Sequence, residues 1–286
     1  MDNILTFDIE EWFHANYDDV SPADYRGRGS RFRAQMDSLL QLCDDNGCKA
    51  TFFVLGCIGE DYPDVVKTLA EQGHEVASHG YSHQLAYRQT REEFKADVEK
   101  SVSILENIIG DAIYGYRAPS WSIVESNLHY LAVLEELGLK YDASIFPVKT
   151  FLYGIPDAPT EIYKPVIDGR EADLYEVPMS VTRFLEKNIG YSGGFYFRLF
   201  PEFWIKKVMR DKNQRGKNTI VYLHPRELDP LEQRLSLPLK EAFIHYYNVA
   251  GARAKLTDIM RSFRFTSIIE YLRISENVDS NAEPAK

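Results

Sequence analysis

The sequence predicts an α/β fold in which a parallel β-sheet is covered by helices. A helix, a glycine and a strand follow one another repeatedly along the chain, and connections of this kind join parallel strands. In addition, 44% of the 286 residues are hydrophobic, which is enough for a large core. A barrel and an open doubly wound sheet both fit this pattern. No glycine-rich phosphate loop follows the first strand, which disfavours the nucleotide-binding kind of open sheet.

The first predicted strand is ILTF, residues 4–7, an apolar run that ends at Asp8. Apolar residues at helical spacing follow over residues 32–43. Gly47 ends that helix, and KATFFVL, residues 49–55, is the second strand.

The same unit then recurs three times, each time with a glycine between helix and strand. The predicted strands of these units are HEVAS (74–78), AIYGY (112–116) and LKYD (139–142). Thr90 and Glu93 form the pattern of a capping box in front of the helix that leads to AIYGY. Further strands are predicted at 174–181, 218–223 and 263–269, with a helix beginning at Pro201.

Polar residues capable of catalysis stand at the carboxyl ends of five predicted strands. They are Asp8, His79, Arg117, Asp142 and His224. In a barrel these ends share one face, where catalytic groups gather. Polar residues also occur at strand ends without any function. Five such residues, two of them histidines, favour a catalytic site over that explanation.

The segment HGYSH places His79 and His83 four residues apart. If the segment is helical, both imidazoles lie on one face and suit two neighbouring positions on a metal ion. Alone this spacing is weak, but a carboxylate near the first strand completes the set. Asp8 and Glu10 point to one face of a strand, while Glu11 points away or lies beyond the strand. Two histidines and one carboxylate leave a catalytic metal with an open position for water.

The remaining carboxylate is then available as a base that removes a proton from the attacking water. Arg117 is a candidate to pair with that base and keep it ionised. His224, on a distant strand, is a candidate donor to a leaving group. Trp121 and Tyr81 are aromatic residues within the motifs and are candidates to pack on a sugar ring, although barrel rims also carry core aromatics.

Five motifs in order resemble those of the NodB-type polysaccharide deacetylases, carbohydrate esterase family 4. The motifs are TFDIE, HGYSH, RAPSWS, YDASIFP and VYLHPRELDP, and they span about residues 3–230. The resemblance is stronger to a subgroup associated with exopolysaccharide gene clusters, in which the first motif reads D-x-E. YSGGFYFRLFP also resembles a G-G-x-x-x-R segment of that subgroup, although a tight turn accounts for its glycines equally well.

The resemblance implies a distorted (β/α)7-type barrel and metal-dependent removal of acetyl groups from N-acetylated sugars. By the same resemblance Asp8 is the base, Arg117 steadies it, and His224 is the general acid. His79 and His83 bind the metal, with Glu10 in place of the usual second aspartate and Glu11 as the alternative.

The third motif implies a backbone N–H near Ser120 that stabilises the oxyanion. Asp142 begins the fourth motif and is either a residue that orients His224 or a turn-forming aspartate. The expected metal is Zn²⁺, although Ni²⁺, Co²⁺ and Fe²⁺ also suit the donor set.

The charge and the apolar runs of the chain indicate which classes of partner and location to expect. A net charge of −10 argues against a nucleic-acid partner. We find neither a signal-peptide pattern nor an apolar run long enough to span a membrane, so we expect a cytoplasmic protein. One domain is predicted over residues 1–275, with a frayed polar tail at 276–286, and the oligomeric state is open.

Two other functions fit the same residues. One is an amidase or cyclic imidase acting on small molecules, which a closed pocket would favour. The other is a catalytically silent carbohydrate-binding barrel, which predicts loss of the base or the acid. Asp8 and His224 are both present, which argues against the silent barrel.

Overall fold

The computed structural model describes residues 1–14, 16, 30–150 and 153–273. Its main sheet has eight strands, and every pairing within it is parallel. The strands are β1 (Asn3–Ile9), β2 (Thr51–Val54), β3 (Glu75–Ser78), β4 (Gly115–Tyr116), β5 (Tyr141–Asp142), β8 (Tyr175–Glu176), β11 (Ile220–Leu223) and β12 (Phe265–Thr266).

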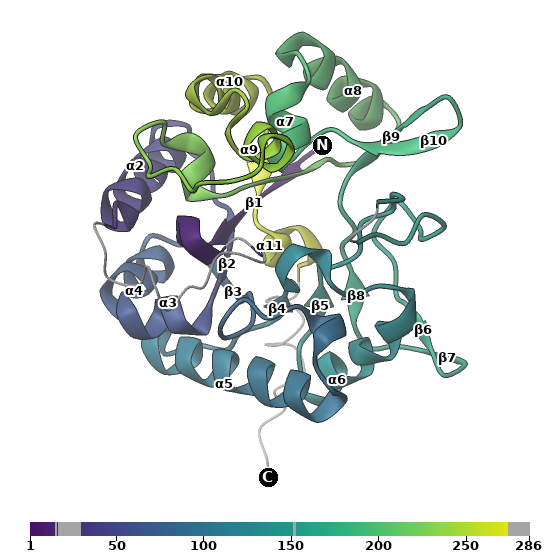
Figure 1. The fold of residues 1–286 in the computed structure, drawn as a ribbon. Coiled ribbons are helices and arrows are strands. Elements are labelled where there is room, and N and C mark those ends of the chain that lie inside the picture. The colour runs from purple at the N-terminus through teal and green to yellow at the C-terminus, as the bar shows by residue number, and fades with distance from the viewer. Residues whose placement is uncertain (15, 17–29, 151–152, 274–286) are drawn as a thin grey trace.

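The sheet runs in the order β11-β1-β2-β3-β4-β5-β8, and β12 adds to β1. It curls into a half-barrel, with helices around its outside (Figure 1). Among the described residues no pairing joins β8 to β11, so the barrel is open there. The predicted distorted barrel is therefore confirmed.

The helices lie outside the sheet, apart from the last one, which closes the end of the barrel where the strands begin. They are α2 (Phe32–Asp45), α3 (Gly56–Asp61), α4 (Pro63–Glu71), α5 (Arg91–Ile109), α6 (Leu131–Glu136), α7 (Gly194–Leu199), α8 (Glu202–Gln214), α9 (Leu239–Tyr246), α10 (Val249–Ser262) and α11 (Ile268–Leu272). The predicted capping box is present at the start of α5, where Thr90 and Glu93 exchange hydrogen bonds with each other's backbone N–H.

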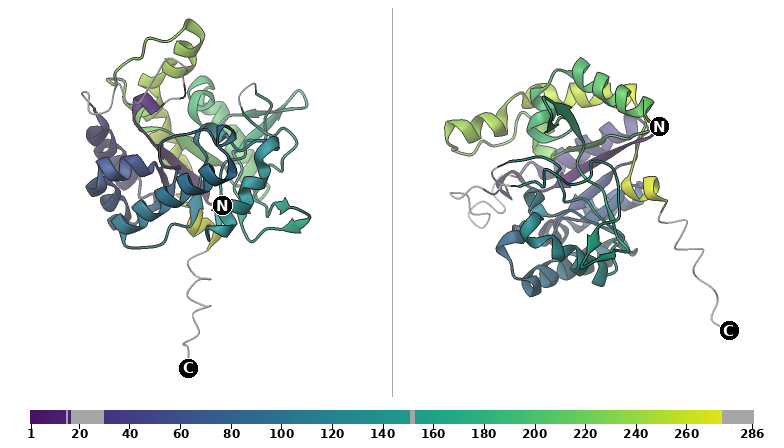
Figure 2. Two further views of the ribbon diagram at one scale, coloured as in Figure 1. Left: turned by 60° about the horizontal axis from the view of Figure 1, so that its bottom comes forward. Right: turned by 90° about the vertical axis from the view of Figure 1, so that its right-hand side faces the viewer.

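Short elements fill the connections. They are the 3-10 helices η1 (Trp12–His14), η2 (Ala86–Arg88), η3 (Pro119–Trp121), η4 (Glu125–Tyr130) and η5 (Pro225–Leu228), and the hairpins β6 (Val166–Ile167) with β7 (Arg170–Glu171) and β9 (Val181–Phe184) with β10 (Lys187–Gly190). The α9 helix projects beyond the face that holds η1 (Figure 2).

Two predicted strands differ from the structure. Residues 174–181 are not one strand, because Pro178 has no N–H to donate and the chain leaves the sheet between β8 and β9. Residues 263–269 pair only at β12. The Ser267 side chain then caps α11 by accepting a hydrogen bond from the Glu270 N–H, so the apolar residues that follow are helical.

Strand β1 is buried on both faces. Leu5, Phe7 and Ile9 pack into the layer between sheet and helices, and Ile4 packs inside the barrel. Since side chains alternate along a strand, Thr6 and Asp8 also point into the barrel. This alternation carries the acidic end of β1 to the inner face, where the candidate site lies.

Candidate metal and acid–base site

Three buried side chains form a compact ligand set at the carboxyl ends of β1 and β3. Glu10 follows β1, and His79 and His83 lie in the loop after β3. One ligand atom of each lies within 4.8 Å of the other two. Glu10 Oε2 is 2.7 Å from His83 Nε2, and the two imidazole centres are 5.4 Å apart. The structure therefore brings together the three residues that the sequence suggested as metal ligands.

The two histidines do not meet through a helical turn. Gly80 and His83 have φ angles of +77° and +61°, and residues 79–83 form a loop. The Tyr81 N–H donates to Asp97 Oδ2 over 2.8 Å, which ties the loop to α5. The helical expectation for HGYSH is wrong, although the imidazoles still converge within this loop.

His79 is fixed with one nitrogen toward the ligand set. Its Nδ1 lies 2.7 Å from the Arg117 carbonyl oxygen, which only accepts, so the hydrogen is assigned to Nδ1. Burial lowers the pKa of His79 to about 4, so the ring is neutral and Nε2 keeps its lone pair.

The donor set fits a divalent cation of the zinc type. Two imidazole nitrogens and one carboxylate are the protein ligands of many catalytic zinc sites, and a carbonyl that holds the outer nitrogen is the usual support for such a histidine. Among the described residues, this is the one group of three or more side chains that meets the distance criterion for a metal.

Glu10 is ionised. Burial alone would raise its pKa, but Arg226, His83 and His224 outweigh burial and hold the pKa well below its usual range. Arg226 Nη1 pairs with Glu10 Oε1, and His224 Nε2 lies 3.1 Å from the same oxygen. Glu11, the alternative ligand, instead accepts a hydrogen bond from the Tyr62 hydroxyl at 2.9 Å.

Asp8 and Arg117 form a fully buried ion pair beside the ligand set. Arg117 Nη1 is 2.6 Å from Asp8 Oδ1 and 3.0 Å from Thr6 Oγ1. Its Nε donates to the Ala143 carbonyl over 3.2 Å, and its guanidinium lies 4.0 Å from the centre of the Phe53 ring. The predicted partnership of Arg117 with Asp8 is present, and its other contacts fix the guanidinium in place.

Glu227, not Asp142, contacts His224. His224 Nδ1 is 2.8 Å from Glu227 Oε2, and Arg198 Nε is 2.8 Å from Glu227 Oε1. Burial would raise the pKa of Glu227, but Arg198 and His224 lower it, so Glu227 is a carboxylate. Of the two roles considered for Asp142, the contacts fit the local turn, in which the Ser144 N–H donates to Asp142 Oδ2 over 3.2 Å, and not the role beside His224.

Asp142 lies under Arg117 in a different pair. Ser144 Oγ donates to Asp142 over 2.5 Å, and Glu176 stands opposite Asp142 where β5 pairs with β8. Burial raises the pKa of both carboxyls, and that of Glu176 well above its usual range. Because two adjacent buried carboxylates cannot both be charged cheaply, we expect the two acids to share a proton.

Two family models match the chain in succession. Residues 5–141 match the polysaccharide deacetylase family, and residues 143–273 match a domain of unknown function, DUF3473. Residues 5–141 therefore form a polysaccharide deacetylase domain. The deacetylase match supplies Asp8, Glu10, the two histidines and Arg117, and the second match supplies His224 with Glu227 and Arg198. Strands of both regions pair in one sheet.

The most similar curated relatives include two bacterial enzymes and one from yeast. Peptidoglycan deacetylase of Helicobacter pylori is 30% identical over 56% of this chain and 56% of its own length. Peptidoglycan-N-acetylglucosamine deacetylase of Bacillus cereus is 33% identical over 32% of this chain and 34% of its own. Chitin deacetylase 1 of Saccharomyces cerevisiae is 30% identical over 32% and 29%. The chain thus spans about half or less of the length of these relatives.

Solved structures support the fold. A crystal structure described as a polysaccharide deacetylase from Mycobacterium smegmatis covers 97% of this chain and 89% of that chain, at 19% identity and a TM-score of 0.59. A pseudoenzyme of carbohydrate esterase family 4 from Bacillus anthracis covers 94% and 65%, at 11% identity and a TM-score of 0.51. These likenesses concern the fold.

The three residues predicted to contact substrate lie in different surroundings. Ser120 and Trp121 lie in η3 with φ angles of +51° and +49°, a strained turn beside the site. Ser120 Oγ accepts from the Asn16 side chain, which also contacts His83. The buried Trp121 Nε1 has no hydrogen-bond partner among the described residues, so it can donate to a ligand.

Tyr81 faces away from the ligand set, contrary to prediction. Its hydroxyl donates to Glu60 over 2.8 Å, and Lys100 Nζ lies 3.3 Å from the centre of its ring. These partners lie on α3 and α5. The glycine pair of YSGGFYFRLFP is likewise explained inside the protein. A Cβ at Gly193 would lie 1.8 Å from Tyr222 Cδ1, so the backbone there approaches a neighbouring ring.

Sequence reasoning missed Glu227, Arg226 and Arg198. The spacing of His224 and Glu227 in HPRE carried a usable signal, since residues three apart in one helical turn can contact each other. Arg198 ends the G-G-x-x-x-R pattern, but nothing in the sequence indicates that it reaches Glu227.

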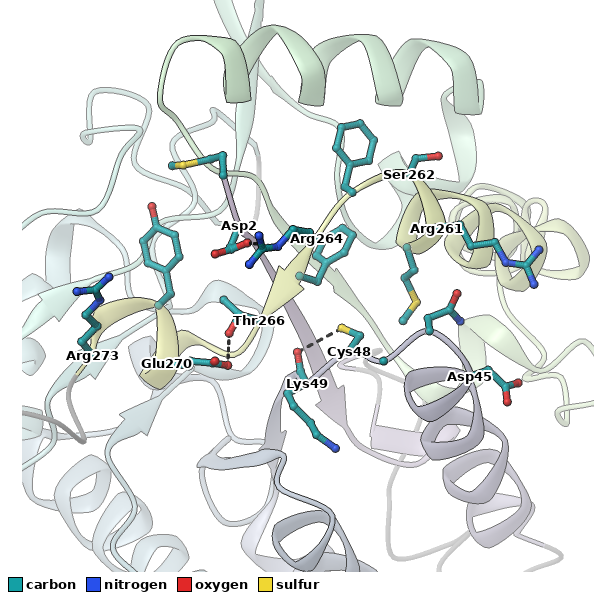
Figure 3. A pocket seen from close by; sticks show the side chains of 17 residues that line it. Asp2, Asp45, Cys48, Lys49, Arg261, Ser262, Arg264, Thr266, Glu270 and Arg273 are labelled. Atoms are coloured by element: carbon teal, nitrogen blue, oxygen red, sulfur yellow. Dashed lines mark hydrogen bonds and ion pairs between the residues drawn. The ribbon is translucent and has the colours of Figure 1, made fainter.

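A large groove of about 1190 Å³ lies at the other end of the barrel (Figure 3). It is lined by residues that precede or begin strands, such as Asp2 and Cys48, and by Arg264 of the final segment. Arg264 pairs with Asp2 at 2.9 Å, and Thr266 bonds to Glu270. In the parts of the chain that the structure describes, no helix has the length and apolarity needed to cross a membrane.

Proposed function

We propose that this chain is a metal-dependent hydrolase that removes N-acetyl groups from an N-acetylated sugar of a polysaccharide or oligosaccharide precursor. One observation carries the proposal. The set of Glu10, His79 and His83 lies between a base held by Arg117 and an imidazole held by Glu227. A metal-dependent hydrolase of acetamides uses these parts, namely a Lewis-acid site, a proton acceptor and a proton donor.

The residues divide the work as follows. A divalent cation held by Glu10, His79 and His83 would polarise the acetamide carbonyl and lower the pKa of water. Asp8 accepts the proton of the attacking water while Arg117 holds the carboxylate in place. His224 donates a proton to the departing sugar amine through Nε2, because Nδ1 is engaged by Glu227. Acetate and the free amine are the products.

The names of the relatives support the substrate class. Peptidoglycan and chitin, named for the H. pylori and yeast proteins, are polymers of N-acetylated amino sugars. We carry the sugar class to this chain and leave the polymer open. We also propose Zn²⁺ as the resident metal, a role in exopolysaccharide synthesis, and a cytoplasmic location.

Acetate release from a panel of N-acetylated mono- and oligosaccharides, with and without a chelator, tests the proposal. We expect release from at least one saccharide, its loss with chelator, and its return with Zn²⁺. A small cyclic imide and a simple amide belong in the same panel. Turnover of these alone would replace the sugar deacetylase by the amidase alternative. No turnover of any member, with metal bound, would indicate a silent barrel.

A further inference from the structure

His224 is held between two carboxylates that differ in their surroundings. Its Nε2 faces Glu10 at 3.1 Å, and its Nδ1 faces Glu227 at 2.8 Å. Since Glu227 only accepts, Nδ1 carries the hydrogen of that bond. Glu227 Oε2 also accepts from the backbone N–H of His224 over 3.1 Å. The Glu227 carboxylate therefore contacts both the imidazole ring and the backbone N–H of His224.

Arg198 in turn fixes Glu227. Its Nε donates to Glu227 Oε1 over 2.8 Å, while its Nη1 donates to the Tyr247 carbonyl over 2.5 Å and its Nη2 to the Ile244 carbonyl over 2.9 Å. These carbonyls lie at the end of α9, where helical carbonyls lack partners within the helix. All three guanidinium nitrogens are thus used, and the side chain is only 3% exposed.

The glycine pair before Arg198 explains how it reaches this position. Gly193 and Gly194 lie directly against the ring of Tyr222, two residues before His224, where a Cβ on either would overlap the ring. The start of α7 therefore packs directly against β11. The G-G-x-x-x-R pattern places Arg198 beside the turn that carries His224 and Glu227.

We propose that Glu227 and Arg198 are positioning residues that hold His224 with Nδ1–H engaged and Nε2 toward the ligand set. The inference rests on the proposed function in so far as His224 is the general acid. It also gives the region matched by the domain of unknown function a role, because that region supplies the acid and both residues that hold it.

Glu227→Gln tests the proposal, because glutamine keeps the shape of the side chain and removes its charge. Two substrates separate positioning of the acid from general damage. An N-acetylated saccharide has an amine leaving group that must be protonated, whereas 4-nitrophenyl acetate has a phenolate that leaves without a proton. We expect kcat for the saccharide to fall about 10- to 100-fold, with KM, bound zinc and the ester rate unchanged. Arg198→Met should behave alike, and Arg198→Lys should recover part of the rate.

Asp229→Asn is the matched control. Asp229 lies two residues from Glu227 and pairs with Arg31 at 2.8 Å, away from His224. The substitution weakens an ion pair of the same segment but changes no contact of His224. We therefore expect the saccharide and ester rates to stay within about twofold of wild type. Equal loss of ester and amide hydrolysis in Glu227→Gln, or no loss of either, would overturn the positioning role.

A measurement that needs no turnover separates this inference from the proposed function. In a ¹⁵N-edited proton spectrum of the zinc-loaded chain, we expect an exchange-protected ring proton of His224, assigned by its absence in His224→Gln. It should be lost or shifted upfield in Glu227→Gln. If the wild-type chain deacetylates no saccharide but shows this proton, the proposed function fails and the positioning stands. If the proton is absent from wild type, the positioning fails whatever the activity.

Discussion

Glu176→Gln tests whether Asp142 and Glu176 share a proton beneath Arg117. Burial raises the pKa of both carboxyls, so the folded chain keeps a proton at pH values where the unfolded chain has released it. Stability from this pair is therefore fully present below the pKa of an unfolded glutamate, which is about 4.3. It declines as the pH rises through the higher pKa of the folded state. The variant cannot lose that proton, because glutamine has none to release.

The size of the effect follows from counting protons. A folded state that binds one proton more than the unfolded state loses about 1.4 kcal/mol of unfolding free energy per pH unit. Wild type should lose stability relative to Glu176→Gln at this slope between the unfolded and folded pKa values. Activity at neutral pH should survive, because the pair carries one negative charge in both proteins and Arg117 keeps Asp8 as its partner.

Urea denaturation followed by tryptophan fluorescence, repeated from pH 4.5 to 8, measures the difference. Glu135→Gln is the control. A hydrogen bond from Arg170 lowers the pKa of Glu135 to about 2, so its contribution is present above the unfolded pKa and is lost as the pH falls. Its difference from wild type should be constant above pH 5. Parallel wild-type and Glu176→Gln curves over the whole range would refute the shared proton.

The remaining predictions concern the site and its support. Asp8→Asn should keep bound metal and lower kcat by about 10²- to 10⁴-fold, and a wild-type rate would remove Asp8 from the mechanism. His79→Ala should lower the metal content in elemental analysis, and unchanged content would mean the ligand set is wrong. His224→Ala should depress saccharide turnover far more than metal binding, which steady-state rates and metal analysis compare directly. Gly193→Ala should cost about 1–3 kcal/mol in urea denaturation, because its Cβ would overlap Tyr222; an unchanged midpoint would contradict the close approach.

The sequence predicted those features of the fold that depend on local pattern. Helix, glycine and strand alternate because each glycine ends a helix, and the capping box of Thr90 and Glu93 formed as expected. Residues at the carboxyl ends of strands converge because parallel strands end on one face. The polar residues at the carboxyl ends of five predicted strands therefore indicated where the site lies.

What the sequence could not predict depends on long-range contacts or on unusual backbone. The histidines of HGYSH meet because Gly80 and His83 adopt positive φ, which no residue spacing reveals. The order of the motifs suggested that Asp142 could orient His224, but its position on β5 places it against Glu176. Glu227, which contacts His224 instead, lies in the same motif as His224. The choice between Asp142 and Glu227 depended on the register of the sheet.

The buried charges of the site explain how a strand can end in carboxylates inside a protein. Asp8 pairs with Arg117 and Glu10 with Arg226, while Glu227 pairs with Arg198. Each pair joins elements that are distant in sequence, and removal of one partner from a buried pair leaves an uncompensated charge that costs about 3–5 kcal/mol. The arginines thus balance the three carboxylates by charges of the chain itself. The acid, the base and the ligand set are therefore held in position by the fold, and a bound cation would add reactivity to an arrangement that already exists.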